Sequence, residues 1–505
     1  MSSSTNEIER RDFLIRLSLF ASSAAISGSL PQRAIAAGAN MNELSASAAV
    51  EAMRNGDIKA EDYAGALLDR AQELARLNAF RTVNREMVLE AARAADRARA
   101  SGGALGILHG LPIPVKDSVN TKDLPTSNGT RALRDFKPRD DAAVLKPLFA
   151  QGAILMGKTN LHELSYGWTS NNAIFGPVRN PYDQEHVPGG SSGGSGAAVA
   201  ARIAPLAIAE DTLGSIRVPA SMCGLAGLRP TFGRYSDAGI MPLTINKFDQ
   251  VGPVARSVAD LLLFDRAATG GREQVAGTPL TGVRIGLSPY FWSGLDPEVE
   301  RVSNKALQKL SDSGATLVWS EIPEFAKAMG IALTIIGYDT LPGISDFLKE
   351  QGADVTFEQM LEQAGEGVRA VMKSVALPPN RPSKEIYESM LSQREELRKS
   401  VRSYFEAKGI VALAFPPIMI APPRIGEDAE VNIGGKKIPL YVAMSRNIAL
   451  GSCASMASLV LPAGITSDGL PVGMEFDALM GNDLQLLSLG LSLEKALGPI
   501  PGPKI

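Results

Sequence analysis

The sequence predicts an α/β fold, because apolar strand patterns alternate with helical patterns along the chain. Residues 283–287 have the composition of a buried strand, residues 297–313 have helical periodicity, and residues 315–318 form a second apolar strand pattern. Alternation of this kind is typical of α/β folds with parallel strands. Apolar runs at 110–116 and 152–158 predict further strands of the same sheet.

The elements before and between these strands follow from composition and periodicity. Residues 42–100 are rich in Ala, Glu, Arg and Leu, which predicts two or three helices before the first strand. The run 110–116 contains two prolines and is otherwise apolar, so we expect a short buried strand that ends at Lys116. A helix-like stretch precedes the strand at 152–158, and the alanine-rich residues 193–208 predict another helix.

The last third of the chain contains a long helical segment followed by late strands. Residues 324–406 look mostly helical, with interruptions at Pro342 and at 378–382, and we expect an insertion or cap over a pocket there. The remaining elements are strands over 411–417, 457–462 and 472–477 and a final helix over 483–497.

The charge of the chain does not favour a nucleic-acid partner. Of its 505 residues, 45% are hydrophobic and 21% are charged, which suffices for one large domain or two. The formal charge of −3 provides no basic field of the kind that attracts nucleic acid, so we expect a small-molecule partner.

Histidines and cysteines are too few for a metal centre or a disulfide framework. His109, His162 and His186 are scattered without metal-ligand spacing, so we expect no metal and no other cofactor. Cys223 and Cys453 leave room for one disulfide. The alternative is that Cys223 is a small buried thiol used for packing among its Ala, Met and Gly neighbours.

The first forty residues resemble an export signal. Arg10 and Arg11 precede a moderately apolar stretch that ends near Leu30, and small residues follow at 34–37. This order is typical of a twin-arginine signal, which we expect over residues 1–37 of a periplasmic or secreted protein. The stretch is too short and polar for a stable membrane anchor. The alternative is a frayed amphipathic helix on a cytoplasmic protein.

Three short segments together predict a serine nucleophile whose base is a lysine. They are residues 110–117 (GLPIPVKD), 189–195 (GGSSGGS) and 211–217 (DTLGSIR). A serine hydroxyl needs a neighbouring base, and a lysine is a base only where burial keeps it uncharged. Lys116 meets this condition at the end of a buried strand. Ser191 can pass a proton between Ser215 and Lys116, because a hydroxyl both donates and accepts hydrogen bonds.

Glycines around both serines predict an oxyanion hole. They allow the backbone to approach a reacting carbonyl and to adopt conformations closed to other residues. One backbone donor to a developing oxyanion is typically worth roughly 3 to 4 kcal/mol. The expected donors are the successive amides of Thr212, Leu213, Gly214 and Ser215.

The complete pattern resembles the amidase signature family, whose members hydrolyse carbon–nitrogen bonds. The resemblance also covers residues 158–163, 175–181, 223–231, 461–464 and 469–473. It implies a single amidase domain over residues 42–500, with a mixed, largely parallel β-sheet covered by helices on both faces.

The same resemblance assigns roles to individual residues. It implies that Ser215 is the nucleophile, that Ser191 is a bridging serine with a cis peptide bond, and that Lys116 is the base. Ser192 and Ser195 compete with Ser191, and only the family register favours Ser191. Residues in supporting roles are Gly189, Gly190, Ser192, Asp211 and Arg217.

Within the family, residues 233–240 and 251–260 look most like the indoleacetamide and mandelamide hydrolases. This implies that a small aryl-alkyl amide is hydrolysed to a carboxylic acid and ammonia or an amine through an acyl-enzyme. Carbamates, anilides and esters are alternatives for the same triad. An amidotransferase subunit that supplies ammonia to a charged transfer RNA and an inactive amide-binding homologue are less favoured. A homodimer is one option for the assembly.

Two residues depart from the family pattern, which usually reads Thr-Asp-Thr-Gly-Gly-Ser where this chain reads EDTLGS. A positive φ at Leu213 would be unfavourable by about 1 kcal/mol or more. Glu210 adds a carboxylate close to the proposed catalytic centre, which either raises the pKa of Lys116 or binds a cationic or amine-bearing substrate.

Three further polar or aromatic residues near the motifs allow two interpretations each. His162 is interpreted as a polar structural residue in preference to a member of a Ser-His-Asp triad. Tyr166 and Trp168 either line an aromatic pocket or fill the core.

Overall fold

The computed structural model describes residues 40–505 except Ile322. The export signal expected at 1–37 therefore lies outside the described residues. Within the described part of the chain, no helix has both the length and the apolar character that a membrane span requires.

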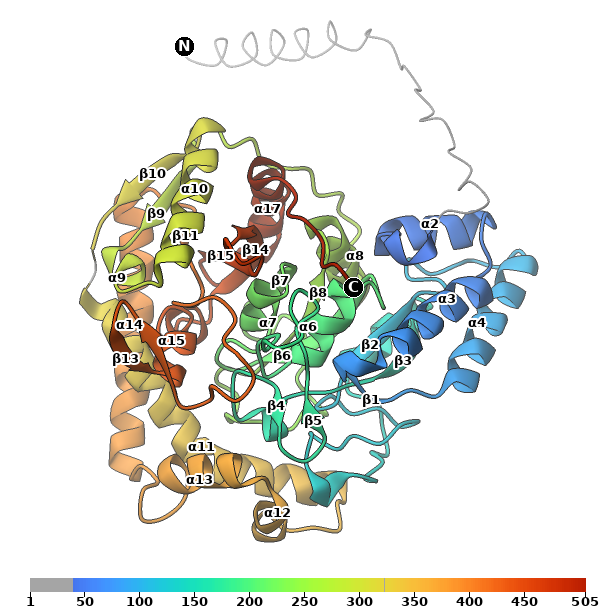
Figure 1. Cartoon of the computed structure of the whole chain (residues 1–505), viewed down its shortest axis with the longest axis horizontal. Helices are drawn as coiled ribbons and strands as arrows, with labels where there is room; N and C mark the ends of the chain where they lie inside the picture. Colours follow the sequence, from blue (N-terminus) through green and yellow to red (C-terminus); the bar gives the residue numbers. More distant parts are fainter. Residues whose placement is uncertain (1–39, 322) are drawn as a thin grey trace, which may run out of the picture. The chain divides into compact units, whose positions relative to one another are not determined.

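A single mixed sheet of 11 strands forms the centre of the described chain (Figure 1). Its strands are β1 (Phe80–Thr82), β2 (Pro112–Lys116), β3 (Ile154–Thr159), β6 (Leu206–Asp211), β7 (Ala226–Arg229), β8 (Gln250–Ala255), β9 (Arg284–Leu287), β10 (Thr316–Trp319), β11 (Ala412–Phe415), β14 (Ala457–Ile465) and β15 (Pro471–Ala478). Two small hairpins add β4 (Asn171–Asn172) with β5 (Gly176–Pro177) and β12 (Glu430–Ile433) with β13 (Lys436–Pro439).

The strand order is β1-β3-β2-β6-β8-β7-β14-β15-β11-β9-β10. The pairs β2–β3, β2–β6, β9–β10 and β9–β11 are parallel. The strands between β6 and β11 pair antiparallel, as β1 does with β3. The predicted α/β fold with a mixed sheet is confirmed, and the strands predicted at 283–287 and 315–318 are the parallel neighbours β9 and β10.

The α-helices of the described chain are α2 (Ala46–Asn55), α3 (Ala60–Glu73), α4 (Arg85–Ala100), α5 (Leu145–Ala150), α6 (Gly193–Ala200), α7 (Arg217–Met222), α8 (Val258–Thr269), α9 (Pro289–Trp292), α10 (Pro297–Asp312), α11 (Ala328–Gln351), α12 (Phe357–Gln363), α13 (Glu366–Val375), α14 (Lys384–Lys408), α15 (Leu440–Ser445), α16 (Ala449–Cys453) and α17 (Asp483–Leu497). Short 3₁₀ turns are η1 (Met41–Glu43), η2 (Ala75–Leu77), η3 (Arg131–Leu133), η4 (Glu163–Ser165) and η5 (Pro323–Lys327).

Helices cover both faces of the sheet, as β14 shows. Val460 packs in one apolar cluster with Ala220 of α7. The preceding residue, Leu459, faces α17, where a Cβ added to Gly490 would lie 2.5 Å from the Leu459 side chain. Successive side chains of a strand point to opposite faces, so α7 and α17 lie on opposite sides of the sheet. Gly490 lets α17 lie close to β14.

The helices predicted in the N-terminal part are present, with one additional strand. Ser45 and Asn84 cap α2 and α4, each accepting a hydrogen bond from a backbone amide of the first turn. The strand β1, which was not predicted, lies between α3 and α4, so two helices precede the first strand and the third follows it. It is a three-residue edge strand, too short to give a periodic signal.

The helix predicted over 193–208 ends earlier, at Ala200. Residue Arg202 has a φ of 59°, and β6 begins at Leu206 and is buried along its whole length. Alanine and isoleucine in this run satisfy a helical pattern and a buried strand equally well, which is why composition alone extended the helix too far.

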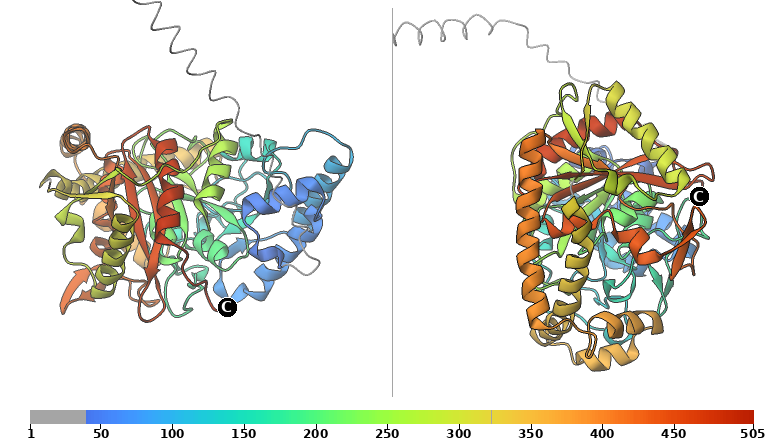
Figure 2. Two further views of the ribbon diagram at one scale, coloured as in Figure 1. Left: turned by 90° about the horizontal axis from the view of Figure 1, so that it is seen from above. Right: turned by 90° about the vertical axis from the view of Figure 1, so that its left-hand side faces the viewer.

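The segment over 324–406 is helical, but Pro342 does not interrupt it. Pro342 lies inside α11 and has no N–H to donate to the carbonyl of Tyr338. That carbonyl accepts hydrogen bonds from Nε and Nη2 of Arg381 instead, at 3.1 and 2.8 Å. The helix therefore continues through the proline. The break at 378–382 separates α13 from α14, and α14 packs along α11 (Figure 2).

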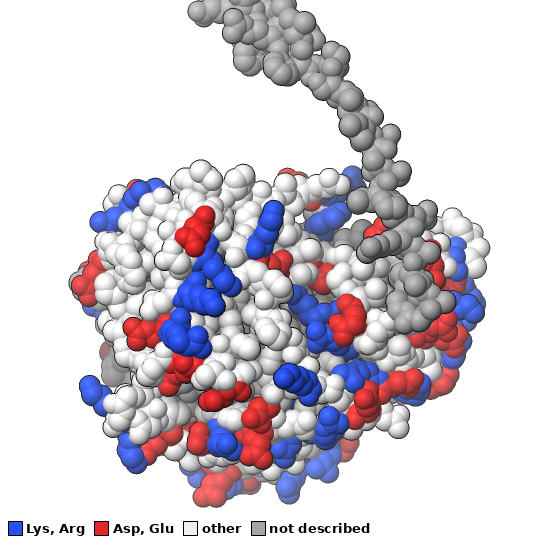
Figure 3. Space-filling model, turned by 45° about the horizontal axis from the view of Figure 1, so that its top comes forward, with Lys and Arg blue, Asp and Glu red and all other residues white. Residues whose placement is uncertain are grey.

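The late elements follow the predicted order, with β11, β14, β15 and α17 at the expected places. Cys223 and Cys453 are free and buried; their thiols lie against the carbonyls of Pro188 and Ala328. On the face shown in Figure 3, acidic and basic side chains are interspersed, in keeping with the formal charge of −3.

Candidate active site

The sheet brings two of the three predicted segments to one edge. Lys116 is the last residue of β2 and Asp211 is the last residue of β6. The two strands are parallel neighbours, with Val115 opposite Ile208. Their carboxyl ends therefore meet, and this register places Glu210 beside Lys116.

Lys116 is completely buried and contacts the serine loop. Its Nζ lies 2.6 Å from Oγ of Ser191, and the peptide bond between Gly190 and Ser191 is cis. Burial lowers the pKa of Lys116, while the neighbouring Glu210 carboxylate acts in the opposite direction. The lysine and the bridging serine expected from the sequence are thus in direct contact.

The three serines of the glycine-rich loop have different partners. Ser192 Oγ donates to the carbonyl of Glu210 at 3.2 Å. Ser195 Oγ donates to the carbonyl of Ile208 at 2.9 Å. Of the three, Ser191 is therefore the one that contacts Lys116, and Ser192 holds the loop against β6.

The glycines before Ser191 allow the loop to pass close to other backbone. Gly189 has a φ of 83°. A Cβ added to Gly190 would lie 2.7 Å from the carbonyl carbon of Trp168, closer than carbon atoms approach in proteins. Both positions thus need glycine for the loop to keep its place.

Asp211 organises the loop that carries Ser215. Its Oδ1 accepts the amide of Gly214 at 2.7 Å and its Oδ2 accepts the amide of Ile216 at 3.0 Å. The Gly214 amide, expected in the oxyanion hole, is therefore directed at Asp211. Among the described residues, the three other expected donors make no hydrogen bond; they are the amides of Thr212, Leu213 and Ser215.

Ser215 itself is 5% exposed. In the part of the chain that the structure describes, its hydroxyl has no hydrogen-bond partner, so the predicted contact with Ser191 is not made in this conformation. The hydroxyl and the three free amides lie on the same short loop between β6 and α7.

Leu213 is accommodated without backbone strain. Its φ is not positive, so the energetic penalty considered for leucine at this position does not arise. Its side chain packs in the apolar cluster that contains Phe248, and its carbonyl accepts a hydrogen bond from Trp168 Nε1 at 2.8 Å. The adjacent Gly214 has a φ of 103°. The residue of this loop with a positive φ is therefore Gly214, and Leu213 keeps an ordinary backbone conformation.

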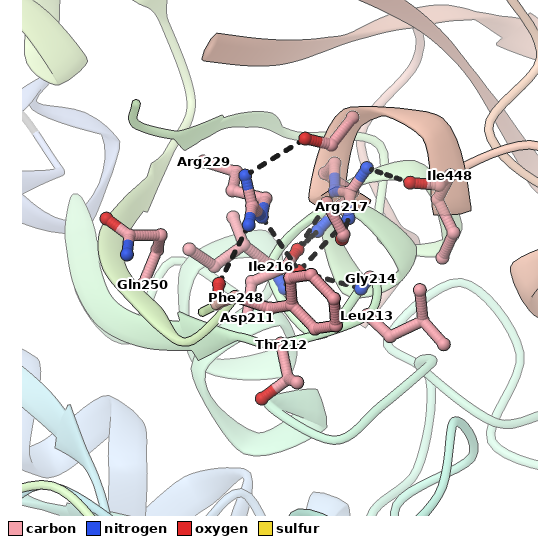
Figure 4. A network of polar contacts seen from close by, with 12 residues as sticks. Asp211, Thr212, Leu213, Gly214, Ile216, Arg217, Arg229, Phe248, Gln250 and Ile448 are labelled. Carbon is pink, nitrogen blue, oxygen red and sulfur yellow. Dashed lines mark hydrogen bonds and ion pairs between the residues drawn. The ribbon is translucent and has the colours of Figure 1, made fainter. Parts of the chain in front are cut away.

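A buried charge network supports the loop (Figure 4). Arg217 donates to Asp211 through Nε at 3.0 Å and to Glu475 through Nη1 at 2.9 Å. Arg229 lies 3.4 Å from Asp211 and donates to the carbonyl of Phe248 at 2.8 Å. The arginines keep the pKa of Asp211 well below its usual value, although burial acts against them.

Arg229 and Glu475 were not predicted as site residues. Arg229 lies within the family motif at 223–231, so its position in the motif was the available signal. Glu475 lies in β15, 258 residues from Arg217, and nothing local in the sequence connects the two.

Other residues missed by the sequence surround Glu210. Oε2 of Glu210 accepts hydrogen bonds from Ser118 at 3.0 Å and from Ser165 at 3.1 Å, besides its ion pair with Lys116 at 2.8 Å. Asp249 accepts the hydroxyl of Thr212, and burial raises the pKa of Asp249 to about 7.

His162 contacts a threonine side chain. Its Nδ1 lies 3.3 Å from Oγ1 of Thr169, and burial lowers its pKa to about 4. Tyr166 and Trp168 pack against the apolar clusters of the core, and the hydroxyl of Tyr166 lies 3.1 Å from that of Thr340 in α11. No group of three or more histidine, cysteine, aspartate or glutamate residues in the described ranges is arranged to hold a metal ion.

Comparisons with known proteins identify the family. The Amidase family profile matches residues 62–487. The chain is 34% identical over 451 residues to the indoleacetamide hydrolase of Agrobacterium vitis, covering 89% of this chain and 96% of that protein. It is 32% identical to the mandelamide hydrolase of Pseudomonas putida, covering 91% and 93%.

A crystal structure of an amidase superposes with a TM-score of 0.81 at 29% identity, covering 90% of this chain and 100% of that one. The predictions of family, fold and amide hydrolysis are confirmed. The chain therefore belongs to the amidase signature family, whose members hydrolyse carbon–nitrogen bonds in amides.

Proposed function

We propose that the protein hydrolyses small aryl-alkyl carboxylic amides through an acyl-enzyme on Ser215, with Ser191 and Lys116 as the proton relay. The observation that carries the proposal is the 2.6 Å contact between the buried amine of Lys116 and Ser191. The neighbouring loop carries the Ser215 hydroxyl and three amides that have no hydrogen-bond partner among residues 40–321 and 323–505.

The proposed reaction begins when Ser215 Oγ attacks the amide carbonyl. The proton of Ser215 passes to Ser191 while the proton of Ser191 passes to Lys116, which requires a neutral amine. The oxyanion is stabilised by the amides of Thr212, Leu213 and Ser215. The proton then returns through Ser191 to the leaving nitrogen, the carbon–nitrogen bond breaks, and water hydrolyses the ester of Ser215.

The substrate class is inferred from the relatives and from the residues beside the nucleophile loop. The two relatives are named for hydrolysis of indoleacetamide and mandelamide, each an amide with an aryl group close to the carbonyl. Leu213, Trp168 and Ile448 give the loop an apolar surrounding, which suits an acyl group of low polarity.

The first experiment replaces the nucleophile. Ser215→Ala should abolish hydrolysis while the far-UV circular dichroism and the melting temperature stay near those of the wild type. An active Ser215→Ala variant contradicts the proposal. A panel of aryl-acetamides, carbamates, anilides and esters then ranks kcat/KM. Higher values for carbamates, anilides or esters than for simple amides would favour the alternative substrate class.

We also propose that the protein is exported in folded form. The support is the arginine pair and small-residue pattern of residues 1–37. Cell fractionation of the full chain and of the variant with Arg10→Lys and Arg11→Lys tests this, since only the wild type should reach the periplasm. The homodimer stays a prediction that light scattering after size-exclusion chromatography can test.

A further inference from the structure

Glu210 occupies a position where the family pattern usually has threonine, and its carboxylate faces the proposed base. The side chains of Lys116 and Glu210 are 0% and 2% exposed, and Nζ lies 2.8 Å from Oε2. The carbonyl oxygen of the same glutamate lies 3.4 Å from Nζ. One residue therefore supplies two of the three acceptors around the amine, and Ser191 is the third.

These contacts bear on the direction of the lone pair in a neutral Lys116 amine. A neutral lysine amine has two N–H bonds and one lone pair. If the two N–H groups donate to the two acceptors of Glu210, the lone pair is left for the hydroxyl of Ser191. The geometry that a neutral base needs in order to accept a proton from Ser191 is thus built by Glu210.

Glu210 is also firmly held, which argues against a role in binding a cationic substrate. Ser118 and Ser165 donate to the same oxygen that pairs with Lys116. These hydroxyls come from the loop after β2 and from η4. The carboxylate oxygen that faces the relay is therefore already occupied by three donors of the protein.

We propose that Glu210 is a positioning residue for Lys116: it orients the neutral amine toward Ser191 and stabilises the ammonium that forms when Ser215 attacks. Its part resembles that of the aspartate in a Ser-His-Asp triad, which orients the base and stabilises its charged form. This inference rests on the proposed function, because it requires Lys116 to be the base.

The other ionisable groups near Lys116 do not replace Glu210. Asp211 faces Arg217 and Arg229. Asp249 is bound by Thr212 and by the amides of Leu243 and Thr244. His162 is buried beside Thr169 and has a lowered pKa, so it stays neutral above about pH 4. Glu210 is therefore the carboxylate in direct contact with the lysine.

A consequence is that Glu210 raises the pH at which Lys116 becomes a free base. A carboxylate in contact with a cation favours its charged form, typically by about 1 to 3 pKa units. The pH dependence of kcat/KM reports the ionisation of groups in the free enzyme. The acid limb of that profile in the full-length enzyme is therefore the quantity to measure.

The test compares Glu210→Gln and Glu210→Thr with Glu210→Asp. We expect the acid limb of kcat/KM to move down by about one pH unit or more in the first two variants, with a lower plateau of kcat in Glu210→Gln because the ammonium loses its counter-charge. Glu210→Asp keeps the charge, so its limb should stay near that of the wild type. Since the family carries threonine here, Glu210→Thr provides a variant expected to fold if the glutamine variant does not.

An acid limb that stays in place in both neutral variants overturns the inference. So does a rise of KM confined to cationic amides, which would assign Glu210 to substrate binding. Lys116→Met distinguishes a failure of the proposed function from a failure of the role of Glu210. If Lys116→Met retains activity, the proposed function fails. If it is inactive while the limb of Glu210→Gln is unmoved, only the role of Glu210 fails.

Discussion

Nε of Arg217 lies 3.0 Å from Oδ2 of Asp211, and the same carboxylate accepts the amides on both sides of Ser215, those of Gly214 and Ile216. One aspartate thus ties the nucleophile loop to a buried arginine that reaches β15 through Glu475. The position of Ser215 and the stability of the sheet are therefore coupled.

Asp211→Asn should destabilise the protein and inactivate it. The substitution removes the charge that pairs with both Arg217 and Arg229 and leaves Arg217 only its contact with Glu475 among the described carboxylates. Breaking a buried pair typically costs about 3 to 5 kcal/mol. Urea unfolding measures the loss, and kcat measures the effect on the loop. Asp69→Asn is the matched control, because its ion pair with Arg85 is exposed at the surface and should leave the unfolding midpoint unchanged. Equal midpoints for the two variants would contradict the prediction.

Gly214→Ala should be far more harmful than Gly233→Ala. Both glycines have positive φ, 103° and 81°, so both substitutions strain the backbone, by about 1 to 2 kcal/mol. A Cβ at Gly214 would also lie 2.0 Å from Cδ1 of Ile448, whereas a Cβ at Gly233 meets no atom within 4 Å. Only Gly214→Ala should shift the loop and reduce kcat. Similar kcat values for the two variants would show that the loop tolerates the added methyl group.

Leu213→Ala separates the packing of the loop from its chemistry. Truncation of a buried leucine typically costs about 2 to 5 kcal/mol, and the side chain of Leu213 is 4% exposed. The amide at this position is kept, so kcat should fall by far less than the roughly 100- to 1,000-fold that loss of an oxyanion donor costs. Thermal unfolding and steady-state kinetics on the same sample provide both measurements. A stable but inactive variant would contradict this division.

The sequence predicts those elements of the fold whose determining interactions lie close together in the chain. The strand ending at Lys116 and the helix over 483–497 were predicted because the signal for each lies within its own residues. The path of α11 through Pro342 was not predicted. It depends on hydrogen bonds from Arg381 to the carbonyl of Tyr338, and no local sequence pattern indicates this contact between distant residues.

The same distinction applies to the candidate site. The chemical types at Lys116, Ser191 and Ser215 predict the proposed relay, and the family motif supplies their register. The sequence left two roles open for Glu210, because only the parallel pairing of β2 with β6 places its carboxylate on the lysine. The engagement of the Gly214 amide by Asp211 is likewise a matter of loop geometry that spacing does not encode.

Asp249→Asn should change how stability depends on pH. Burial raises the pKa of Asp249 to about 7 in the folded protein, above the value of 3.8 for an unperturbed aspartate. The folded state thus holds a proton that the unfolded state releases. Stability from this group is fully present below about pH 4 and is lost as the pH rises to about 7. Asparagine can keep the partners, accepting the amides of Leu243 and Thr244 with its oxygen and donating to the hydroxyl of Thr212.

The expected result is that Asp249→Asn gains stability relative to the wild type as the pH rises from about 4.5 to 7.5. A shift of about three units corresponds to about 4 kcal/mol, which sets the upper limit of the gain. Urea unfolding of both proteins at several pH values gives the difference directly, because the titration of all other groups is shared. A difference that stays constant over this range would mean that Asp249 is already ionised in the folded protein.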